Sequence, residues 1–290
     1  MKQKLIKIAL ISLQILLVAG LFVCLGFASN EQGKVKCRVI NINIDHGNGD
    51  FFVNNDDILK IIETETGNQI GKTSNEISLA RIEAAIRKEP HISNAEASLS
   101  LDGQLTIDIM QKRAVVRIIN NVGESFYLNE DGDVMPLSDI YAASVPVATG
   151  NITETEALFS YRSLNIPETD PMANITVLDD IFRISKYIEK DTFWNAQIQQ
   201  MVVDPKGDIL LIPTMGEHTI VFGKAIDIDE KFNKLMHFYM EGLNKTGWNK
   251  YSIINLNYKN QVVCLRKGIQ PQVPTTKPDT ALTNSPNIQR

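Results

Sequence analysis

The sequence predicts an α+β protein with an N-terminal transmembrane helix, a small domain of strands and two helices, and a mostly antiparallel β domain with two or more helices. Three observations lead to this prediction. Residues 8–28 carry no charged side chain. Many later stretches alternate apolar with polar residues, which is typical of half-buried strands. Other stretches space their apolar residues three or four positions apart, as amphipathic helices do.

The composition excludes some classes of protein. The chain has 290 residues, of which 43% are hydrophobic and 22% charged, as in an ordinary globular protein of one or two domains. Its net charge is -5, and a nucleic-acid-binding protein normally presents a basic face. We therefore expect no nucleic-acid partner.

The N-terminal segment predicts a membrane anchor. Lysines lie in residues 1–7, and residues 8–28 would span roughly 30 Å as a helix, the thickness of a bilayer core. Lysines before the span and none directly after it place residues 1–7 in the cytoplasm and the remainder outside it. Gly26-Phe27-Ala28 also fits a signal-peptidase site, so a cleaved signal peptide is the alternative. Four positions mark the predicted anchor: Ile8, Leu16, Phe22 and Ala28.

A first exported domain is predicted over residues 37–111, in the order strand, helix, helix, hairpin. The run RVININID alternates isoleucine with asparagine, as a half-buried strand does. Asn54 can cap a helix that ends at Gly67. Ser78 can cap a second helix, which Pro90 stops.

The stretch NAEASLSLDGQLTIDIMQK predicts the hairpin that completes this domain. Apolar and polar residues alternate on both sides of Asp102-Gly103. Asp-Gly accepts positive φ at both central positions of a turn, which favours a hairpin.

A second domain is predicted over residues 112–267. RAVVRII, ESFYLNEDGDVMPL, VPVATG and EHTIVFG have the pattern of short strands, and QIQQMVVDPKGDILLIP that of a hairpin. Helical spacing occurs in residues 177–188 and 228–244, whereas residues 151–173 show no period. Lys231 and Lys234 are interpreted as a solvated helix face. Residues 268–290 are polar and proline-rich, and we expect a disordered tail.

The stretch INLNYKNQVVCLRK, residues 254–267, predicts the last hairpin of this domain. Its strands would be INLNY and QVVCLRK, turned at Lys259-Asn260. Asn260 tolerates positive φ but Lys259 does not favour it, so we expect a three-residue bulged turn. The second strand would lie at a sheet edge, which the polar tail is poorly suited to cover.

No catalytic or metal-binding constellation is present in the sequence. The four histidines form no HExxH motif, and the chain lacks a CxxC, a GxSxG and a phosphate-binding glycine loop. We expect no cofactor, no metal and no enzyme activity. Cys37 and Cys264 are interpreted as apolar strand residues, although a bridge between them stays open.

Two ordered sets of motifs carry a resemblance to known families. The strand–helix–helix–hairpin order, with EPHISNAEASLSLDGQLTIDIMQKRAVVRI at its end, resembles a POTRA domain. FYLNEDGDVMP, VPVATG, EHTIVFGKAIDIDEKFNKLMHFY and INLNYKNQVVCLR follow in the order found in the FtsQ/DivIB family of bacterial cell-division proteins. Two departures are the Lys259-Asn260 turn and residues 157–173, which have no counterpart.

The resemblance implies a non-catalytic divisome scaffold that helps control septal peptidoglycan synthesis. It implies a single-pass protein of the cytoplasmic (inner) membrane, located at the division septum, with the bulk of the chain in the periplasm. It further implies FtsB-like and FtsL-like single-pass partners, and other divisome proteins as candidate partners of the POTRA domain. An FtsB-like strand would extend the last sheet along these residues: Tyr258, Asn260, Gln261, Val262, Val263, Cys264 and Leu265.

Two other functions are weighed against this one. A POTRA-containing factor of envelope assembly or secretion would chaperone substrate strands, but such proteins usually carry several POTRA repeats or a barrel. An exported wall hydrolase would need catalytic motifs that the sequence lacks.

Overall fold

The computed structural model describes residues 35–47, 49–159, 164 and 176–268, together with residues 14, 16–18 and 20. Within these ranges, no helix combines the length and the apolar character that crossing a bilayer requires. Leu16 is helical and exposed, whereas Ile8, Phe22 and Ala28 of the predicted anchor lie outside the described residues. Nearly all of the predicted tail lies outside them as well.

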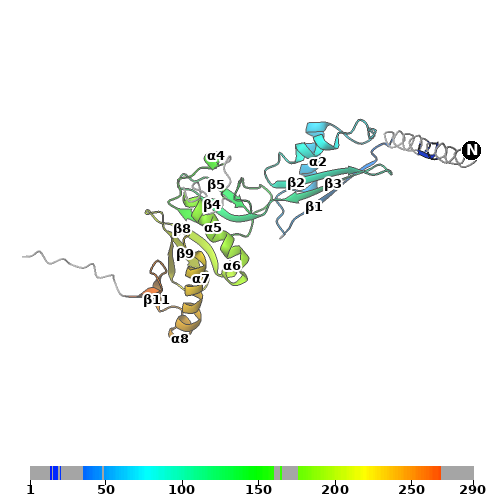
Figure 1. Ribbon diagram of the computed structural model, residues 1–290. Helices are drawn as coiled ribbons and strands as arrows, with labels where there is room; N and C mark the ends of the chain where they lie inside the picture. The colour runs from blue at the N-terminus through cyan, green and yellow to red at the C-terminus, as the bar shows by residue number, and fades with distance from the viewer. Residues whose placement is uncertain are drawn as a thin grey trace, which may run out of the picture.

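The first domain contains a three-stranded sheet in the order β1-β3-β2. β1 pairs in parallel with β3, and β2 pairs with β3 antiparallel. Figure 1 shows α2 packed over this sheet, and isoleucines of both helices share one core with the strands. The elements are β1 (Val39–Asp45), α2 (Asn55–Thr66), α3 (Leu79–Ile86), β2 (Ile92–Leu99) and β3 (Gln104–Gln111).

Both helices of this domain begin and end close to the predicted positions. The Asp57 amide donates to Asn54 Oδ1 at 2.9 Å, and the Asn54 amide donates to Asp57 Oδ2 at 3.1 Å, which completes a capping box. Gly67 ends α2 with a φ of 78°. Ser78 precedes α3, but its side chain makes no capping hydrogen bond.

The β2–β3 hairpin turns where Asp102-Gly103 predicts, although only the glycine has a positive φ, of 88°. The Gly103 amide donates to Ser100 O at 3.0 Å, and the Ser100 amide donates to Gln104 O at 3.0 Å. The turn therefore occupies residues 101–103, with the glycine in the left-handed position of a three-residue loop.

The second domain contains a nine-stranded sheet in the order β12-β11-β10-β9-β8-β7-β4-β5-β6. Most strand pairs of this sheet are antiparallel, as predicted. The sheet is nevertheless mixed, because β4–β7, β7–β8 and β10–β11 are parallel pairs. Parallel neighbours need crossover connections. Helices supply them between β7 and β8 and between β10 and β11, whereas β4 is joined to β7 through β5, β6 and an irregular segment. The strands are β4 (Ala114–Ile119), β5 (Ser125–Asn129), β6 (Val134–Met135), β7 (Val147–Gly150), β8 (Ile198–Val203), β9 (Ile209–Pro213), β10 (Thr219–Gly223), β11 (Tyr251–Asn255) and β12 (Val263–Arg266).

Helices pack on one face of this sheet and share the main core with it (Figure 1). The two predicted helices are α5 and the run from α7 through a π-helical turn into α8. The sequence did not predict α4 or α6, since each is too short to show a period. The helices are α4 (Glu156–Phe159), α5 (Val177–Lys190), α6 (Thr192–Gln197), α7 (Ile228–His237), η1 (Phe238–Leu243) and α8 (Asn244–Thr246).

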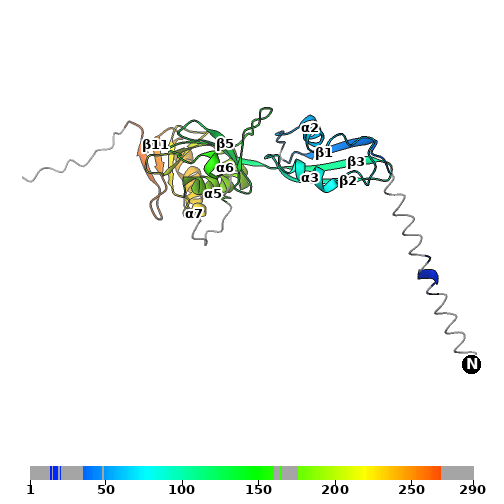
Figure 2. The ribbon, with the colours of Figure 1, turned by 90° about the horizontal axis from the view of Figure 1, so that it is seen from above.

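The two domains follow one another along the molecule (Figure 2) and meet at a small aromatic cluster. Phe52 of the first domain is 2% exposed and packs with Tyr127 and Met135 of the second. His91 Nε2 donates to Pro136 O at 3.1 Å, and Ser138 Oγ donates to Phe52 O at 2.9 Å. The domains are therefore joined by side-chain packing as well as by the chain.

Candidate partner-binding edge

β12 is the edge strand that the sequence predicts. It pairs antiparallel with β11, and no other strand of the described residues pairs with its outer side. Four residues in extended conformation span about 13 Å. An edge of this kind presents unpaired main-chain N–H and C=O groups, to which another chain can add a strand.

The side chains of this edge alternate between the two faces of the sheet. Val262 and Cys264 pack against the main core. Val263 is 41% exposed, and its position opposite Asn255 places it on the other face, along with Leu265. The outer face of β12 is therefore apolar and accessible to solvent.

The boundaries predicted for this hairpin are wrong. β11 ends at Asn255, and residues 256–262 form a connection that is longer than the predicted three-residue turn. Tyr258, Asn260, Gln261 and Val262 consequently lie outside the strands, and only Val263, Cys264 and Leu265 of the predicted set lie in β12. The turn itself is at residues 259–260, as predicted, and Asn260 has a φ of 58°.

Contacts with β10 explain why the alternation stops short of Tyr258. The Leu256 side chain is buried, and its amide donates to Val221 O at 3.0 Å. A Cβ atom added at Gly223 would lie 2.3 Å from Asn257 Oδ1, so the Asn257 side chain occupies the space beside this glycine. The chain therefore turns away from β12 directly after β11, which leaves Tyr258 47% exposed in the connection.

Lys234 of α7 fixes this connection. Its Nζ donates to Leu256 O at 3.2 Å and to Tyr258 O at 3.0 Å, and it pairs with Glu230 at 3.4 Å. Its side chain is 17% exposed. The interpretation of Lys234 as part of a solvated helix face is therefore wrong.

The prediction that Lys231 lies on a solvated helix face is also wrong, since this residue is only 8% exposed. Its Nζ donates to Phe222 O and Lys224 O, both at 2.8 Å, and lies 4.8 Å from the centre of the Phe222 ring. Burial lowers the pKa of this lysine below its ordinary value. The ammonium group joins the start of α7 to the end of β10.

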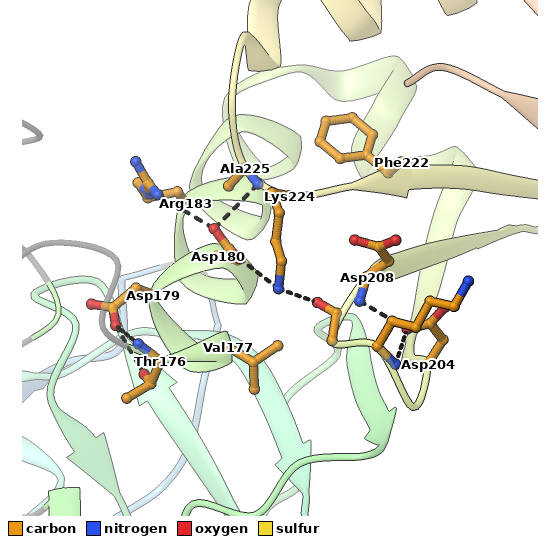
Figure 3. Close-up of polar contacts among 12 residues, drawn as sticks. Thr176, Val177, Asp179, Asp180, Arg183, Asp204, Asp208, Phe222, Lys224 and Ala225 are labelled. Carbon is orange, nitrogen blue, oxygen red and sulfur yellow. Dashed lines mark hydrogen bonds and ion pairs between the residues drawn. The ribbon is translucent and has the colours of Figure 1, made fainter. Parts of the chain in front are cut away.

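A second polar network joins α5 to residues 224–225, between β10 and α7 (Figure 3). The Asp180 carboxylate accepts a hydrogen bond from the Ala225 amide at 3.2 Å and pairs with Lys224 at 3.8 Å. Lys224 Nζ also donates to Gly207 O at 2.6 Å in the β8–β9 turn. The segment that leads into α7 is therefore connected to the rest of the domain.

Three acidic residues lie at the start of α7. Asp229 and Glu230 lie in the first turn of α7, where negative charge interacts favourably with the helix dipole. Asp227 is the N-cap residue with a φ of 52°, and its side chain makes no capping hydrogen bond. These carboxylates form no metal site: across the described ranges, no group of three or more His, Cys, Asp or Glu side chains could hold a metal ion.

Both described cysteines are free thiols. Cys37 is buried in the core of the first domain, while Cys264 lies in β12. The bridge that the sequence left open is therefore absent between them. Burial raises the pKa of Cys264 to about 11, so that the thiol is protonated at neutral pH and acts as an apolar edge residue.

Two family models match the chain. The model described as "FtsQ/DivIB, C-terminal related" matches residues 113–265, and the model described as "POTRA-like domain" matches residues 35–110. No curated protein matches the chain. The first match covers more than half of the 290 residues, and its range contains both the nine-stranded sheet and nearly all of the β12 edge. The chain therefore belongs to the FtsQ/DivIB family.

Proposed function

We propose that this protein is a non-catalytic scaffold of the bacterial division apparatus. In this proposal a single N-terminal helix anchors it in the cytoplasmic membrane, and both domains lie in the periplasm. It binds FtsB-like and FtsL-like single-pass proteins at the septum and thereby helps control septal peptidoglycan synthesis. Family membership supports the division-related role, and one structural observation supports the binding mode: β12 is an edge strand.

The geometry of the edge favours strand addition over a side-chain-only contact. Main-chain hydrogen bonds to β12 would supply affinity, and alternate side chains of the incoming strand would supply specificity. On the outer face these side chains would lie beside Val263 and Leu265, which favours apolar residues in the partner. Exposed Lys259 and Arg266 lie near either end of the edge, so acidic residues flanking the partner strand would be favourable.

Tyr258 is expected to contact the partner from the connection instead of from the strand. Its side chain is 47% exposed, while Lys234 fixes its carbonyl. An exposed tyrosine on a fixed backbone can bury a large surface at a small cost in conformational entropy. Tyrosine is also enriched among residues that dominate binding energy.

The binding test compares Val263→Glu with Val122→Glu in pull-downs of the FtsB-like protein by the full chain. Val263 is 41% exposed on the edge and Val122 is 68% exposed in the β4–β5 turn, so both variants should fold. A glutamate at position 263 would place a charge beside the added strand, and we expect at least tenfold weaker binding, roughly 1.4 kcal/mol. Tyr258→Ala should weaken binding in the same direction.

The same pair of variants tests the role in cells. After depletion of the wild-type chain, a fluorescent fusion carrying Val122→Glu should form a mid-cell band and restore division. The Val263→Glu fusion should leave the cells filamentous. Normal binding and normal division by a folded Val263→Glu protein would exclude β12 as the partner site, and the absence of any division defect on depletion would exclude the proposed function.

A further inference from the structure

Two large apolar side chains are exposed at one end of the first domain. Ile70, in the loop after α2, is 56% exposed, and Leu101, at the tip of the β2–β3 turn, is 71% exposed. Both line a shallow surface pocket with residues 35–38. Because neither side chain belongs to this domain's core and both line one pocket beside the point where the chain enters the fold, the pair is a candidate contact surface.

Main-chain hydrogen bonds fix both loops to the entering chain. The Cys37 amide donates to Lys72 O at 2.9 Å, and the Gly71 amide donates to Cys37 O at 2.8 Å. The Arg38 amide donates to Gly103 O at 2.7 Å. Ile70 and Leu101 therefore have defined positions on either side of the entry point.

The predicted anchor places this entry point near the membrane. The predicted span ends at Ala28 and the described domain starts at Val35, so the link between them reaches at most about 25 Å. The opposite end of β3, which leads into the second domain, lies about 25 Å further along the strand.

The charges at this end suit a phospholipid surface. Lys36 and Arg38 are exposed, and Lys72 is partly exposed. Asp102 and Glu76 lie close by and offset part of this charge, so the apolar tips have to provide most of the attraction. Lysine and arginine can place their stems along an apolar surface while their cationic groups reach lipid phosphates.

We propose that this end of the first domain rests on the periplasmic surface of the phospholipid bilayer. Ile70 and Leu101 enter the boundary between headgroups and acyl chains, and Lys36 and Arg38 lie at the level of the phosphates. The contact orients the elongated molecule (Figure 2), so that the second domain and its β12 edge face the periplasm at a set distance from the membrane. The inference rests on the predicted anchor of the proposed function.

The test uses the full chain reconstituted in vesicles of phosphatidylethanolamine and phosphatidylglycerol, with and without brominated phosphatidylcholine, which quenches tryptophan in contact with acyl chains. Leu101→Trp is compared with Val122→Trp, since both positions are exposed turn residues, 71% and 68%. Trp194 and Trp248 lie in the second domain, and their emission is removed by subtracting the wild-type signal. We expect brominated lipid to quench the emission added by Leu101→Trp, and to leave that added by Val122→Trp unchanged.

A second variant and a flotation assay separate the possible failures. Adding Ile70→Asp to Leu101→Trp should reduce the quenching, because a charge opposes insertion of the neighbouring tip. If the chain floats with the vesicles but Leu101→Trp is not quenched, the surface contact is wrong while the anchor stands. If the chain does not float, the anchor and the surface contact are both wrong, whereas the β12 pull-down still tests partner binding independently.

Discussion

At Gly103 the backbone has a φ of 88°, and a Cβ there would lie 2.3 Å from Lys36 O. Two requirements therefore coincide at one residue: a left-handed turn and a close approach of the entering chain. The sequence predicts the first, because Asp-Gly is a turn signal. It does not predict the second, because Lys36 is distant in sequence and reaches the turn only through the parallel pairing of β1 with β3.

Gly103→Ala should therefore destabilise the first domain more than Gly71→Ala does. Gly71 has a φ of 86°, but a Cβ added there would meet no atom within 4 Å. We expect Gly71→Ala to cost about 1 kcal/mol for the left-handed conformation alone, and Gly103→Ala to cost about 3 kcal/mol because strain and steric overlap add. Urea unfolding of the full-chain variants measures both values, and equal losses would show that the contact with Lys36 relaxes freely.

At the scale of the element, the edge depends on α7 as much as on β11 and β12. Two lysines of this helix donate to main-chain carbonyls: Lys231 to the end of β10, and Lys234 to the connection before β12. Each ammonium group gives these carbonyls a hydrogen-bond donor, which a neighbouring strand or helix would supply in regular structure. The helix thus fixes the carbonyl groups of Leu256 and Tyr258 in the connection before β12.

Lys234→Met should loosen this connection without unfolding the domain. Methionine retains the apolar stem but leaves two carbonyls without their ammonium donor. A hydrogen bond to a charged group contributes about 1.5 kcal/mol, which corresponds to roughly tenfold faster local opening. The rate of hydrogen exchange at the main-chain amides of residues 256–262 measures this local opening. Lys245→Met is the control, because its ion pair with Glu241 is 72% and 75% exposed; similar exchange in both variants would contradict the role of Lys234.

For the whole molecule, the contact between the domains decides where the β12 edge lies relative to the end of the first domain that carries Ile70 and Leu101. Phe52 stacks with His91 at 5.3 Å and meets Tyr127 edge-on at 5.8 Å. Pro136 and Ser138, both from the segment after β6, bond to the first domain. These contacts fix the orientation of the two domains relative to each other, although only one short chain segment connects them (Figure 2).

Phe52→Ala should release this contact between the domains while both sheets stay folded. Removing a buried phenylalanine costs about 3 kcal/mol, more than a small domain interface of this kind can lose without opening. Distances between spin labels in the two domains of the full chain should broaden relative to wild type. Val122→Ala is the control, since Val122 is 68% exposed in the β4–β5 turn. An unchanged distance distribution for Phe52→Ala would show that other contacts determine the domain arrangement.

Residue order alone determined the local elements of this protein. Alternation located β1, β2 and β3, capping residues located α2 and α3, and helical spacing located α5 and α7, because these signals depend on near neighbours in the chain. The edge position of β12 was expected from the resemblance to the FtsQ/DivIB family, and the polar, proline-rich segment after the strand is poorly suited to cover that edge.

Only the tertiary structure decided how distant segments meet. The parallel pairing of β10 with β11 made Leu256 a buried neighbour of Val221, which ended the alternation early and left Tyr258 in the connection. The positions of Lys231 and Lys234 in the sequence predict a solvated helix face. In the structure both ammonium groups instead donate to main-chain carbonyls, at the end of β10 and in residues 256–258. Periodicity cannot show such contacts, because strand order and burial depend on which segments are adjacent in space.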